Sequence, residues 1–592
     1  MPAMPPPEPR TDRRPGAGAE PTARIFLGTA PDDFDAATDL VIGPWSLLEN
    51  PRCTADWRDT GYEDPYPTSD ALSADAKRIA MLANAIVVDR ASAFNAHHGT
   101  SYGYEYWRIL LLPWVLWISQ AVWIRYRLVE AFVERNRGRS VTGTAACGDR
   151  NWPSRDMVDL HRSVLQTPEF NEWLSGRIVR RLAPPHWRIE EASAPPPGAR
   201  AAEPHDTEAG AFVGAARRIR RALSDQRCRK VYGITWQASL FSVYLSFLPA
   251  RPSTRLTGPA PSMADAAASF PDAFLEQLED VLDRTVSDPV GDAFAAYDAR
   301  AAARRYRAGK INLIGPILIL NEDEKFVMAH AVEKGERIVC TQHGSSGYQS
   351  ANINSVEIEN RQDAYLSWGW REQNDYRGKV IPLPSPLYVR YRGKARPAAS
   401  SLLYVATGAR IYGHRLESAF QPGQAADYAS DIARFFAALP SDIRARAAYR
   451  TYANDAGIAD TVTPVRTAFP DLSFHKGPLH RDLLRSRLTV IDHYGTTFGI
   501  ALIADAPALM IWNRAVWDIC PQAEDVFGAL LDAGIAHTDP VSAARFAADI
   551  WENAGDWWRS DAVQSARRTF CDRYALTDRL WIFRWLSALR RI

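Results

Sequence analysis

An alternation of buried strands and helices in the second half of the chain constrains the fold more than any other feature. Residues 311–320 read INLIGPILIL, a continuous apolar run that is typical of a strand buried on both faces. Asn321 and Glu324 form a capping-box-like pair that opens a helix, and Gly335 supplies its C-terminal stop. Residues 336–342 then return as a strand. This order predicts a parallel sheet, because parallel strands need a crossover connection.

The same alternation resumes after a break at residues 391–400, which we interpret as a linker between two lobes. The next strand ends at Gly408, another ends near Arg450, and residues 487–512 read as strand, loop, helix and strand. The sequence therefore predicts an α/β fold with two Rossmann-like lobes, in which helices cover both faces of each parallel sheet. Ligands of such folds bind at the carboxyl ends of the strands.

The N-terminal part of the chain shows helical periodicity. Between about residues 69 and 136, apolar side chains recur at spacings of three, four and seven. Residues 109–124 are the most apolar stretch, but Pro113 interrupts it and it is shorter than a membrane span requires. We expect it to form a buried helix within a large helical elaboration of the first lobe.

These patterns divide the chain into segments. We expect residues 1–22 to be a disordered tail, residues 23–392 to be the N-terminal lobe with a Pro-rich insert near residues 192–211, residues 400–575 to be the C-terminal lobe, and residues 576–592 to be a final helix.

The final helix has two interpretations. Its arginines and apolar residues form a basic amphipathic pattern that can lie on an anionic membrane surface. Alternatively, it packs on the first lobe, with Trp581 and Trp585 as core anchors. We favour packing, because a single short helix binds a membrane only weakly and reversibly. Peripheral membrane contact stays open as the other interpretation.

Composition and absent motifs exclude several classes of protein. A net charge of +1 argues against nucleic acid as the main partner, which normally needs a basic excess. The six cysteines show no CxxC spacing, and the N-terminus lacks an apolar signal segment, so we expect a cytoplasmic protein. There is neither a strand-linked GxGxxG nor a P-loop, so no cofactor is expected. The early acidic pair Asp33 and Asp35 lies where a helix starts, so we expect no metal site.

A polar, Gly-rich loop follows the strand that ends near residue 341. His343 at this strand end can point into a cleft, and its neutral imidazole can deprotonate a hydroxyl. Hydroxyls and N–H groups of the loop can hold a phosphate or a sugar. Alternatively, His343 only hydrogen-bonds the loop. The candidate loop residues are Gln342, Gly344, Ser345, Ser346, Gly347 and Tyr348, with Trp370 as a further acceptor candidate.

A second polar loop follows the strand at residues 487–491 and runs into a helix. The N–H groups and the dipole at a helix start suit an anionic phosphate, and Gly495, Thr496 and Thr497 lie there. Alternatively, one threonine is only an N-cap. Asp492 can bind a sugar hydroxyl or orient His493, and His493 fits a structural hydrogen bond as well as it fits a ligand.

Further candidates are weaker. Arg450, His475 and Lys476 offer positive charge at predicted strand ends, where it would favour a departing phosphate, although surface charge explains them equally. Gly408 ends a strand, but any tight turn would use glycine there.

A series of short motifs occurs in order along the chain: Gly43-Pro44-Trp45, Tyr106-Trp107-Arg108, Pro113-Trp114, Gln342-His343-Gly344, Gly347-Tyr348, Ser367-Trp368-Gly369-Trp370, His475-Lys476-Gly477, Asp492-His493-Tyr494-Gly495-Thr496-Thr497, Pro507 and Ile511-Trp512. Through these motifs the chain resembles the bacterial transferases of surface-carbohydrate loci. The resemblance covers most of residues 24–590.

More distantly, the second half is similar to bilobal GT-B enzymes, namely capsular Kdo transferases and CDP-glycerol glycerophosphotransferases. This resemblance implies His343 as a base, and Asp492, Thr496 and Thr497 as ligands of the donor phosphate. Those enzymes usually have a glycine-richer loop after the histidine, where this chain has Ser345 and Ser346.

The resemblance implies an inverting, metal-independent glycosyltransferase. The N-terminal lobe would bind a glycan or a lipid-linked acceptor, and the C-terminal lobe would bind a nucleotide sugar as co-substrate. The alternatives are a GT-B-fold sugar-nucleotide epimerase, which would need no acceptor, and a non-catalytic glycan-binding protein.

Overall fold

The computed structural model describes most of the chain. The described residues are 22–48, 50, 62, 64–66, 69–192, 227–255, 261–344, 350–372, 378–397, 400–421, 423–452, 457–475 and 477–592. The predicted tail up to residue 21 and the predicted insert from residue 193 onwards lie outside them. In the described part, strands form three separate sheets, and every strand pair within them is parallel. The predicted α/β class with parallel sheets is confirmed.

The C-terminal unit is a doubly wound sheet with strand order β12-β11-β10-β13-β14-β15. The strands are β10 (Leu402–Val405), β11 (Ala447–Arg450), β12 (Ser473–Phe474), β13 (Leu488–Ile491), β14 (Ala508–Ile511) and β15 (Ala536–His537). The helices are α14 (Gln424–Ala438), α15 (Ser441–Arg444), α16 (Val462–Ala468), α17 (Leu479–Leu483), α18 (Thr496–Ala504), η4 (Pro521–Ala523), α19 (Glu524–Asp532), α20 (Pro540–Asp549), α21 (Ala554–Arg559) and α22 (Asp561–Tyr574). The central strands β10, β13 and β14 are buried throughout, as sheets covered on both faces require.

The middle unit holds a second sheet, with strand order β5-β6-β7-β8-β9. Its strands are β5 (Cys228–Arg229), β6 (Ile311–Ile314), β7 (Arg337–Thr341), β8 (Ala364–Ser367) and β9 (Val380–Pro382). Its helices are α7 (Gln237–Phe247), α10 (Phe294–Ala302), α11 (Ile317–Leu320), α12 (Glu322–Glu333), α13 (Ser355–Ile358) and η3 (Tyr388–Arg390). Two further helices of this stretch of the chain, α8 (Met263–Ala267) and α9 (Asp272–Arg284), pack instead on the N-terminal helices α2 (Ser69–His98) and α3 (Tyr104–Asn136).

The predicted strand over residues 311–320 is wrong in its second half. Strand β6 ends at Ile314, and the short helix α11 begins at Ile317. Gly315 lies so close to the neighbouring chain that a Cβ there would meet the carbonyl oxygen of Lys230 at 2.0 Å. Pro316 follows it, so the apolar run bends at this point and continues as a helix.

The N-terminal unit contains a third parallel sheet, which the sequence did not predict. Its order is β2-β1-β3-β4, with β1 (Ala23–Phe26), β2 (Leu40–Val41), β3 (Val141–Ala146) and β4 (Arg188–Ala192). Its helices are α1 (Trp45–Leu48), α2 (Ser69–His98), α3 (Tyr104–Asn136), α4 (Met157–Asp159), the π-helical η2 (Leu160–Leu165) and α5 (Pro168–Leu182). The expected helical elaboration is therefore an α/β unit of its own. This sheet is hard to predict, because β4 is polar and largely exposed and Gly143 lies inside β3.

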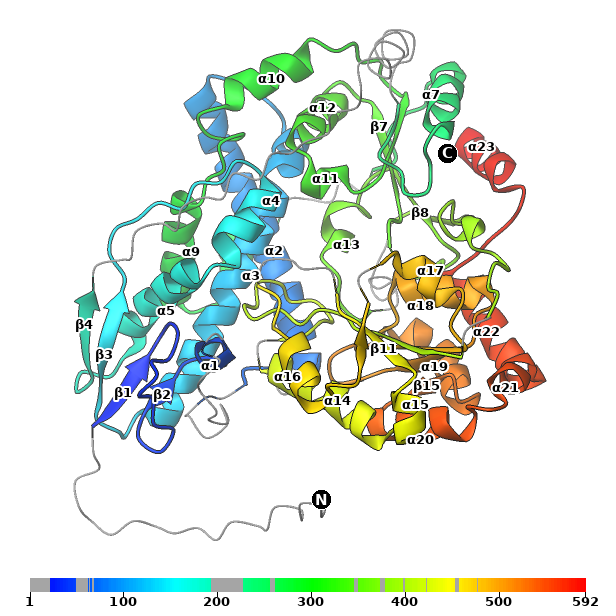
Figure 1. Cartoon of the computed structure of the whole chain (residues 1–592). Coiled ribbons are helices and arrows are strands. Elements are labelled where there is room, and N and C mark those ends of the chain that lie inside the picture. Colours follow the sequence, from blue (N-terminus) through cyan, green and yellow to red (C-terminus); the bar gives the residue numbers. More distant parts are fainter. Residues whose placement is uncertain are drawn as a thin grey trace, which may run out of the picture.

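Helix α3 is the central element of this part of the molecule. In the described part of the chain it is the one helix long and apolar enough to cross a membrane, but its most apolar window is entirely buried. It packs against α2, α5, α9 and α12 (Figure 1). The predicted buried helix at residues 109–124 is confirmed.

The chain ends by returning to the middle unit. After α22 of the C-terminal unit, helix α23 (Trp581–Arg591) lies beside α7 (Figure 1). Trp585 is fully buried there, and its indole N–H donates to the carbonyl of Pro384 at 2.9 Å. The favoured interpretation of the last helix, packing through Trp581 and Trp585, agrees with the structure.

Candidate active site

The carboxyl ends of the central strands place the predicted polar residues on one edge of the C-terminal sheet. Val405 of β10 pairs with Arg450 of β11 and with Ile491 of β13, and Tyr449 pairs with Phe474 of β12. Gly408, Arg450, His475 and Asp492 therefore all end or follow neighbouring strands at the same edge. This is where open α/β sheets bind ligands.

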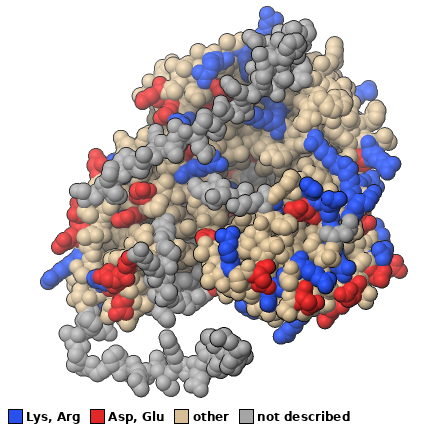
Figure 2. All heavy atoms as spheres, in the orientation of Figure 1, with Lys and Arg blue, Asp and Glu red and all other residues tan. Residues whose placement is uncertain are grey.

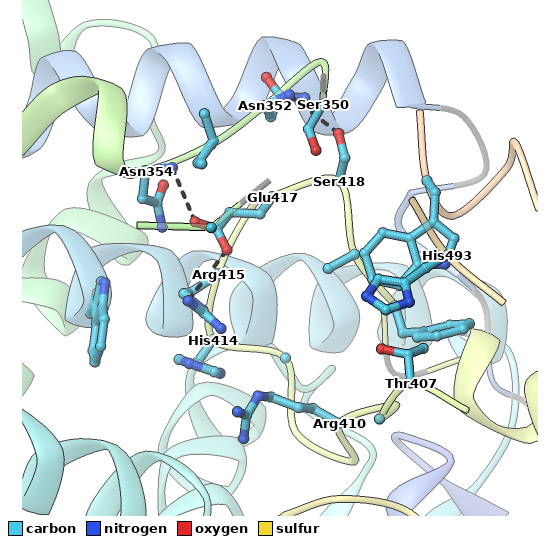
Figure 3. Close-up of a pocket in the computed structure, with 18 of the residues that line it drawn as sticks. Ser350, Asn352, Asn354, Thr407, Arg410, His414, Arg415, Glu417, Ser418 and His493 are labelled. Carbon is cyan, nitrogen blue, oxygen red and sulfur yellow. Dashed lines mark hydrogen bonds and ion pairs between the residues drawn. The ribbon is translucent and has the colours of Figure 1, made fainter. Parts of the chain in front are cut away.

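A cavity of ≈ 430 Å³ lies between this edge and the carboxyl end of β7 in the middle unit. His343 and Gly344 line it from the middle unit, Gly408 and His493 line it from the C-terminal unit, and Trp117 of α3 reaches it from the N-terminal unit. Figure 3 shows His493 and Thr407 on one side and His414, Arg410 and Arg415 on the other. The volume of the cavity lies within the ~300–1,000 Å³ that is usual for small-molecule sites. Two Rossmann-like units with a cavity between their strand ends form a GT-B-like arrangement.

His343, which follows the end of β7, is a titratable residue that lines this cavity. Its Nε2 lies 3.3 Å from Oε2 of Glu359, whose side chain is fully buried. Burial of the imidazole works to lower the pKa of His343, but the charge of Glu359 and its hydrogen bond outweigh burial, and the net pKa is raised from the usual 6.5. Because Nε2 faces Glu359, Nδ1 is left to accept a proton. A carboxylate that orients an imidazole in this way is typical of a general base.

Gln342 and Trp370 support the loop that contains His343 and Gly344. Nε2 of Gln342 donates to the carbonyl of Gly344 at 2.7 Å, and its Oε1 accepts from the indole N–H of Trp370 at 2.9 Å and from the backbone of Trp368 at 2.7 Å. Trp370 is buried and does not line the cavity. The structure therefore gives these two residues a supporting position rather than an acceptor-binding one.

The loop after His343 meets the start of α18 from the other unit. A Cβ at Gly344 would lie 3.3 Å from Oγ1 of Thr496, so the two strand-end loops are in contact range. Thr496 and Thr497 are half-buried at the first turn of α18 and do not line the cavity themselves. The other predicted loop residues, Ser345, Ser346, Gly347 and Tyr348, lie outside the described residues.

Asp492 is buried beneath the cavity and holds the loop that follows β10. Its Oδ1 accepts from the backbone N–H of Thr407 at 2.8 Å, and the hydroxyls of Tyr428 and Tyr404 donate to its Oδ2. Burial raises the pKa of Asp492 to about 7, although these hydrogen bonds act to lower it. The carboxyl group does not line the cavity, so its position is that of an anchor for the loop.

His493 lines the cavity next to this anchor. Burial lowers its pKa to about 4, so the imidazole is neutral at physiological pH. Its Nδ1 is buried, lies 3.8 Å from Oδ1 of Asp492, and has no hydrogen-bond partner among the described residues. A Cβ at Gly495 would lie 2.2 Å from Nε2 of His493, so the imidazole fills the space that a side chain at this position would occupy. A neutral imidazole held in this way can bind a ligand through a hydrogen bond.

The structure describes two of the three predicted cationic candidates. Arg450 donates to the carbonyl of Gly477, and His475 is half-exposed, with its Nδ1 3.3 Å from Asp482. Neither of them lines the cavity. Lys476 lies outside the described residues. Positive charge in the cavity comes instead from Arg410 and Arg415, on the loop that follows β10.

Sequence reasoning missed this loop almost completely. Besides the two arginines, it brings Thr407, Tyr412, His414, Glu417 and Ser418 to the cavity, facing Asn352 and Asn354 of the segment after β7. Backbone N–H groups of Asn354 and Asn352 donate to Glu417 and Ser418, which joins the two units across the cavity. Of the residues in this loop, only Gly408 at its start was a candidate from the sequence. Glu359, the partner of His343, was not a candidate. Among the described residues, no group of three His, Cys, Asp or Glu side chains is placed to hold a metal ion.

Comparison with known proteins gives a family and distant structural likenesses. MurG of Acinetobacter baumannii shares 10% identity and a TM-score of 0.28 over 46% of this chain and 71% of that one. The wall teichoic acid polymerase TagF shares 10% identity and a TM-score of 0.27 over 52% and 75%. The glycotransferase of kitacinnamycin shares 14% identity and a TM-score of 0.22 over 78% and 93%.

These TM-scores are below 0.5, so the description of the fold depends on the strand order of this chain itself. No curated protein matches the chain. The model of the LIC12162 family transferases, in contrast, matches residues 23–589, which include all three α/β units and the whole cavity. The chain therefore belongs to the LIC12162 family of transferases.

Proposed function

We propose that this transferase is an inverting, metal-independent glycosyltransferase that moves a sugar from a nucleotide-activated donor to a cell-surface glycan or lipid-linked acceptor in the cytoplasm. The observation that carries the proposal is the pair of His343 and Glu359, which opens onto a cavity between two parallel sheets at their carboxyl ends. A general base aimed into such a cavity suits the removal of a proton from an acceptor hydroxyl.

The proposed reaction is a single displacement. Nδ1 of His343 takes the proton of the acceptor hydroxyl, and the oxygen attacks the anomeric carbon of the donor sugar. The bond from that carbon to the donor phosphate breaks, and the nucleotide leaves with the electron pair. Because the oxygen attacks opposite the leaving group, the anomeric configuration inverts.

Charge on the leaving phosphate would be balanced from the C-terminal unit. Arg410 lines the cavity on the loop held by Asp492, and the first turn of α18 adjoins it at Gly344. Helix-start N–H groups and a guanidinium both stabilise a developing phosphate charge. Sequence reasoning gave this role to Arg450, Lys476 and the helix start at Thr497. In the present proposal Arg410 stands in place of Arg450 and Lys476, the helix start keeps its role, and no metal ion is required.

A thermal-shift screen tests the proposal. Purified protein is heated with CMP-, UDP-, GDP- or CDP-linked sugars, with and without EDTA. We expect one nucleotide class to raise the melting temperature, because a ligand that binds only the folded state stabilises it, and we expect EDTA not to change the shift.

Two glycine variants control the screen. Gly408→Leu would crowd the cavity wall, since a Cβ there already meets the lining residues Ile458 and Tyr452 at 3.0 Å, and it should abolish the shift. Gly528→Ala, with no atom within 4 Å of its new Cβ, should keep it. No shift with any donor, or an equal shift in both variants, would contradict the proposal.

A further inference from the structure

Helix α7 and its N-cap residue, Trp236, carry a row of large apolar side chains that face solvent. Trp236, Leu240, Val243 and Phe247 are all exposed, and Phe247 is 84% exposed. At about 100° per residue, the four side chains fall within roughly 60° of the helix circumference and extend over about 16 Å. We call these four residues the α7 stripe. Scattered apolar residues are normal on a surface, but a continuous row of this kind marks a contact site.

The opposite face of α7 is fully used by the fold. Phe241 and Leu245 are buried, and Phe241 contacts the rings of Trp581 and Trp585 in α23. The hydroxyl of Tyr244 donates to the carbonyl of Leu586 at 3.0 Å. The stripe is therefore held outward, and packing among the residues that the structure describes does not explain it.

Helix α23 extends the same surface with apolar and basic side chains. Leu580 and Phe583 are exposed, and Phe583 is 69% exposed. Arg584, Arg590 and Arg591 share this outer face of α23, at helical spacing from Leu580. The two helices lie side by side (Figure 1).

The charge around this surface is strongly one-sided. Residues 227–255 contain no Asp or Glu, and residues 576–592 contain only Asp578, which pairs with Arg584. The exposed cations of these two segments are Lys230, Arg251, Arg579, Arg584, Arg590 and Arg591. The whole chain is almost neutral, at +1, so this basic excess is local. In Figure 2, blue spheres border the tan surface at the upper right, where α7 and α23 lie.

We propose that the α7 stripe and the outer face of α23 form a docking surface for an anionic lipid bilayer. The apolar side chains would enter the boundary between headgroups and acyl chains, and the arginines would bind the lipid phosphates. A bilayer fits better than a second copy of the chain, because a second copy would bring the same arginines against each other.

The surface reaches towards the proposed base. Tyr232, at the start of the segment that leads into α7, is exposed, and its ring lies 6.2 Å from that of His343. A docked enzyme would therefore hold the His343 side of the cavity near the bilayer, where a lipid-linked acceptor lies. This consequence rests on the proposed function, whereas bilayer binding itself does not.

Vesicle co-sedimentation of the full-length protein tests the proposal. We expect binding to vesicles that contain phosphatidylglycerol, at least about tenfold weaker binding to pure phosphatidylcholine, and loss of binding at high salt. The double variant Trp236→Ser with Phe247→Ser should weaken binding to the anionic vesicles about tenfold or more. Because both side chains are exposed, its melting temperature should stay within a few degrees of wild type.

Further variants separate the contributions of the apolar and the basic side chains to vesicle binding. Met81→Ser removes a side chain of α2 that is 53% exposed, and it should leave vesicle binding unchanged. Arg579→Gln with Arg590→Gln should reduce the preference for anionic vesicles and the salt dependence. A wild-type protein that ignores anionic vesicles, or a stripe variant that binds them normally, would overturn the proposal. A wild-type dimer that the stripe variant converts to a monomer, with unchanged vesicle binding, would assign the stripe to a contact between copies instead.

Discussion

Two of the histidine–carboxylate pairs, His343 with Glu359 and His493 with Asp492, lie at facing strand ends where the histidines line the cavity, and they behave in opposite ways. At the end of β7, His343 lies 3.3 Å from Glu359, and the pKa of its imidazole is raised. At the end of β13, His493 lies 3.8 Å from Asp492, and burial lowers the pKa of its imidazole to about 4.

The difference lies in the carboxyl groups and their partners. Asp492 is surrounded by Tyr404, Tyr428 and the N–H of Thr407, and burial raises its pKa to about 7, so it offers His493 little negative charge. At His343, burial is the largest single effect on the pKa, but the charge of Glu359 and its hydrogen bond together outweigh it. A histidine beside a carboxyl group thus gives a proton acceptor in one unit and a neutral hydrogen-bonding group in the other.

Replacement of the proton acceptor should have the largest effect. We expect His343→Ala to lower turnover about 10²–10⁴-fold, the usual contribution of a general base, while the donor-induced thermal shift persists. Release of nucleotide in the presence of acceptor measures the turnover. His97→Ala, at an exposed position on α2, serves as the control. Near-normal turnover in His343→Ala would give this histidine a structural role.

Displacement of the neutral imidazole of His493 should have a smaller effect than replacement of His343. A Cβ at Gly495 would lie 2.2 Å from Nε2 of His493, while the φ of Gly495, −70°, suits any residue. We therefore expect Gly495→Ala to fold normally but to weaken donor binding about tenfold, as measured by calorimetric titration. Gly528→Ala is the matched control. Unchanged affinity in Gly495→Ala would remove His493 from the donor site.

Replacement of Asp492, the buried residue that anchors the loop after β10, should have the smallest effect. This effect should appear in the stability of the protein. A carboxyl group with a folded pKa near 7 and an unfolded pKa near 3.8 holds more protons when folded, so its contribution to stability falls as pH rises from about 4 to 7. We expect Asp492→Asn to gain melting temperature relative to wild type over this range, and to keep the gain above pH 7. A difference that does not change with pH would contradict the raised pKa.

The sequence predicted the regular parts of the fold well. The parallel sheets, the buried helix at residues 109–124 and the common edge of Gly408, Arg450, His475 and Asp492 all follow from continuous apolar runs ended by polar loops. Such runs report burial directly, because a strand covered on both faces needs apolar side chains at every position.

The rest could not be read from local patterns. Strand β4 is an exposed polar edge, so its residues carry no strand periodicity. Glu359 meets His343 only through tertiary folding, since it follows the short helix α13 rather than a strand end. The direction of Arg450, towards Gly477 and away from the cavity, also depends on the rotamer that its neighbours allow.

The pH dependence of kcat/KM in wild type and in Glu359→Gln tests the central claim most directly. A base must be deprotonated to act, so activity should rise with pH through the pKa of His343, with a midpoint above 6.5 in wild type. In Glu359→Gln the raising charge is lost and burial remains, so the midpoint should fall below 6.5. The same profile in Asp492→Asn should keep the wild-type midpoint. A midpoint that Glu359→Gln leaves in place would show that His343, paired with Glu359, is not the base.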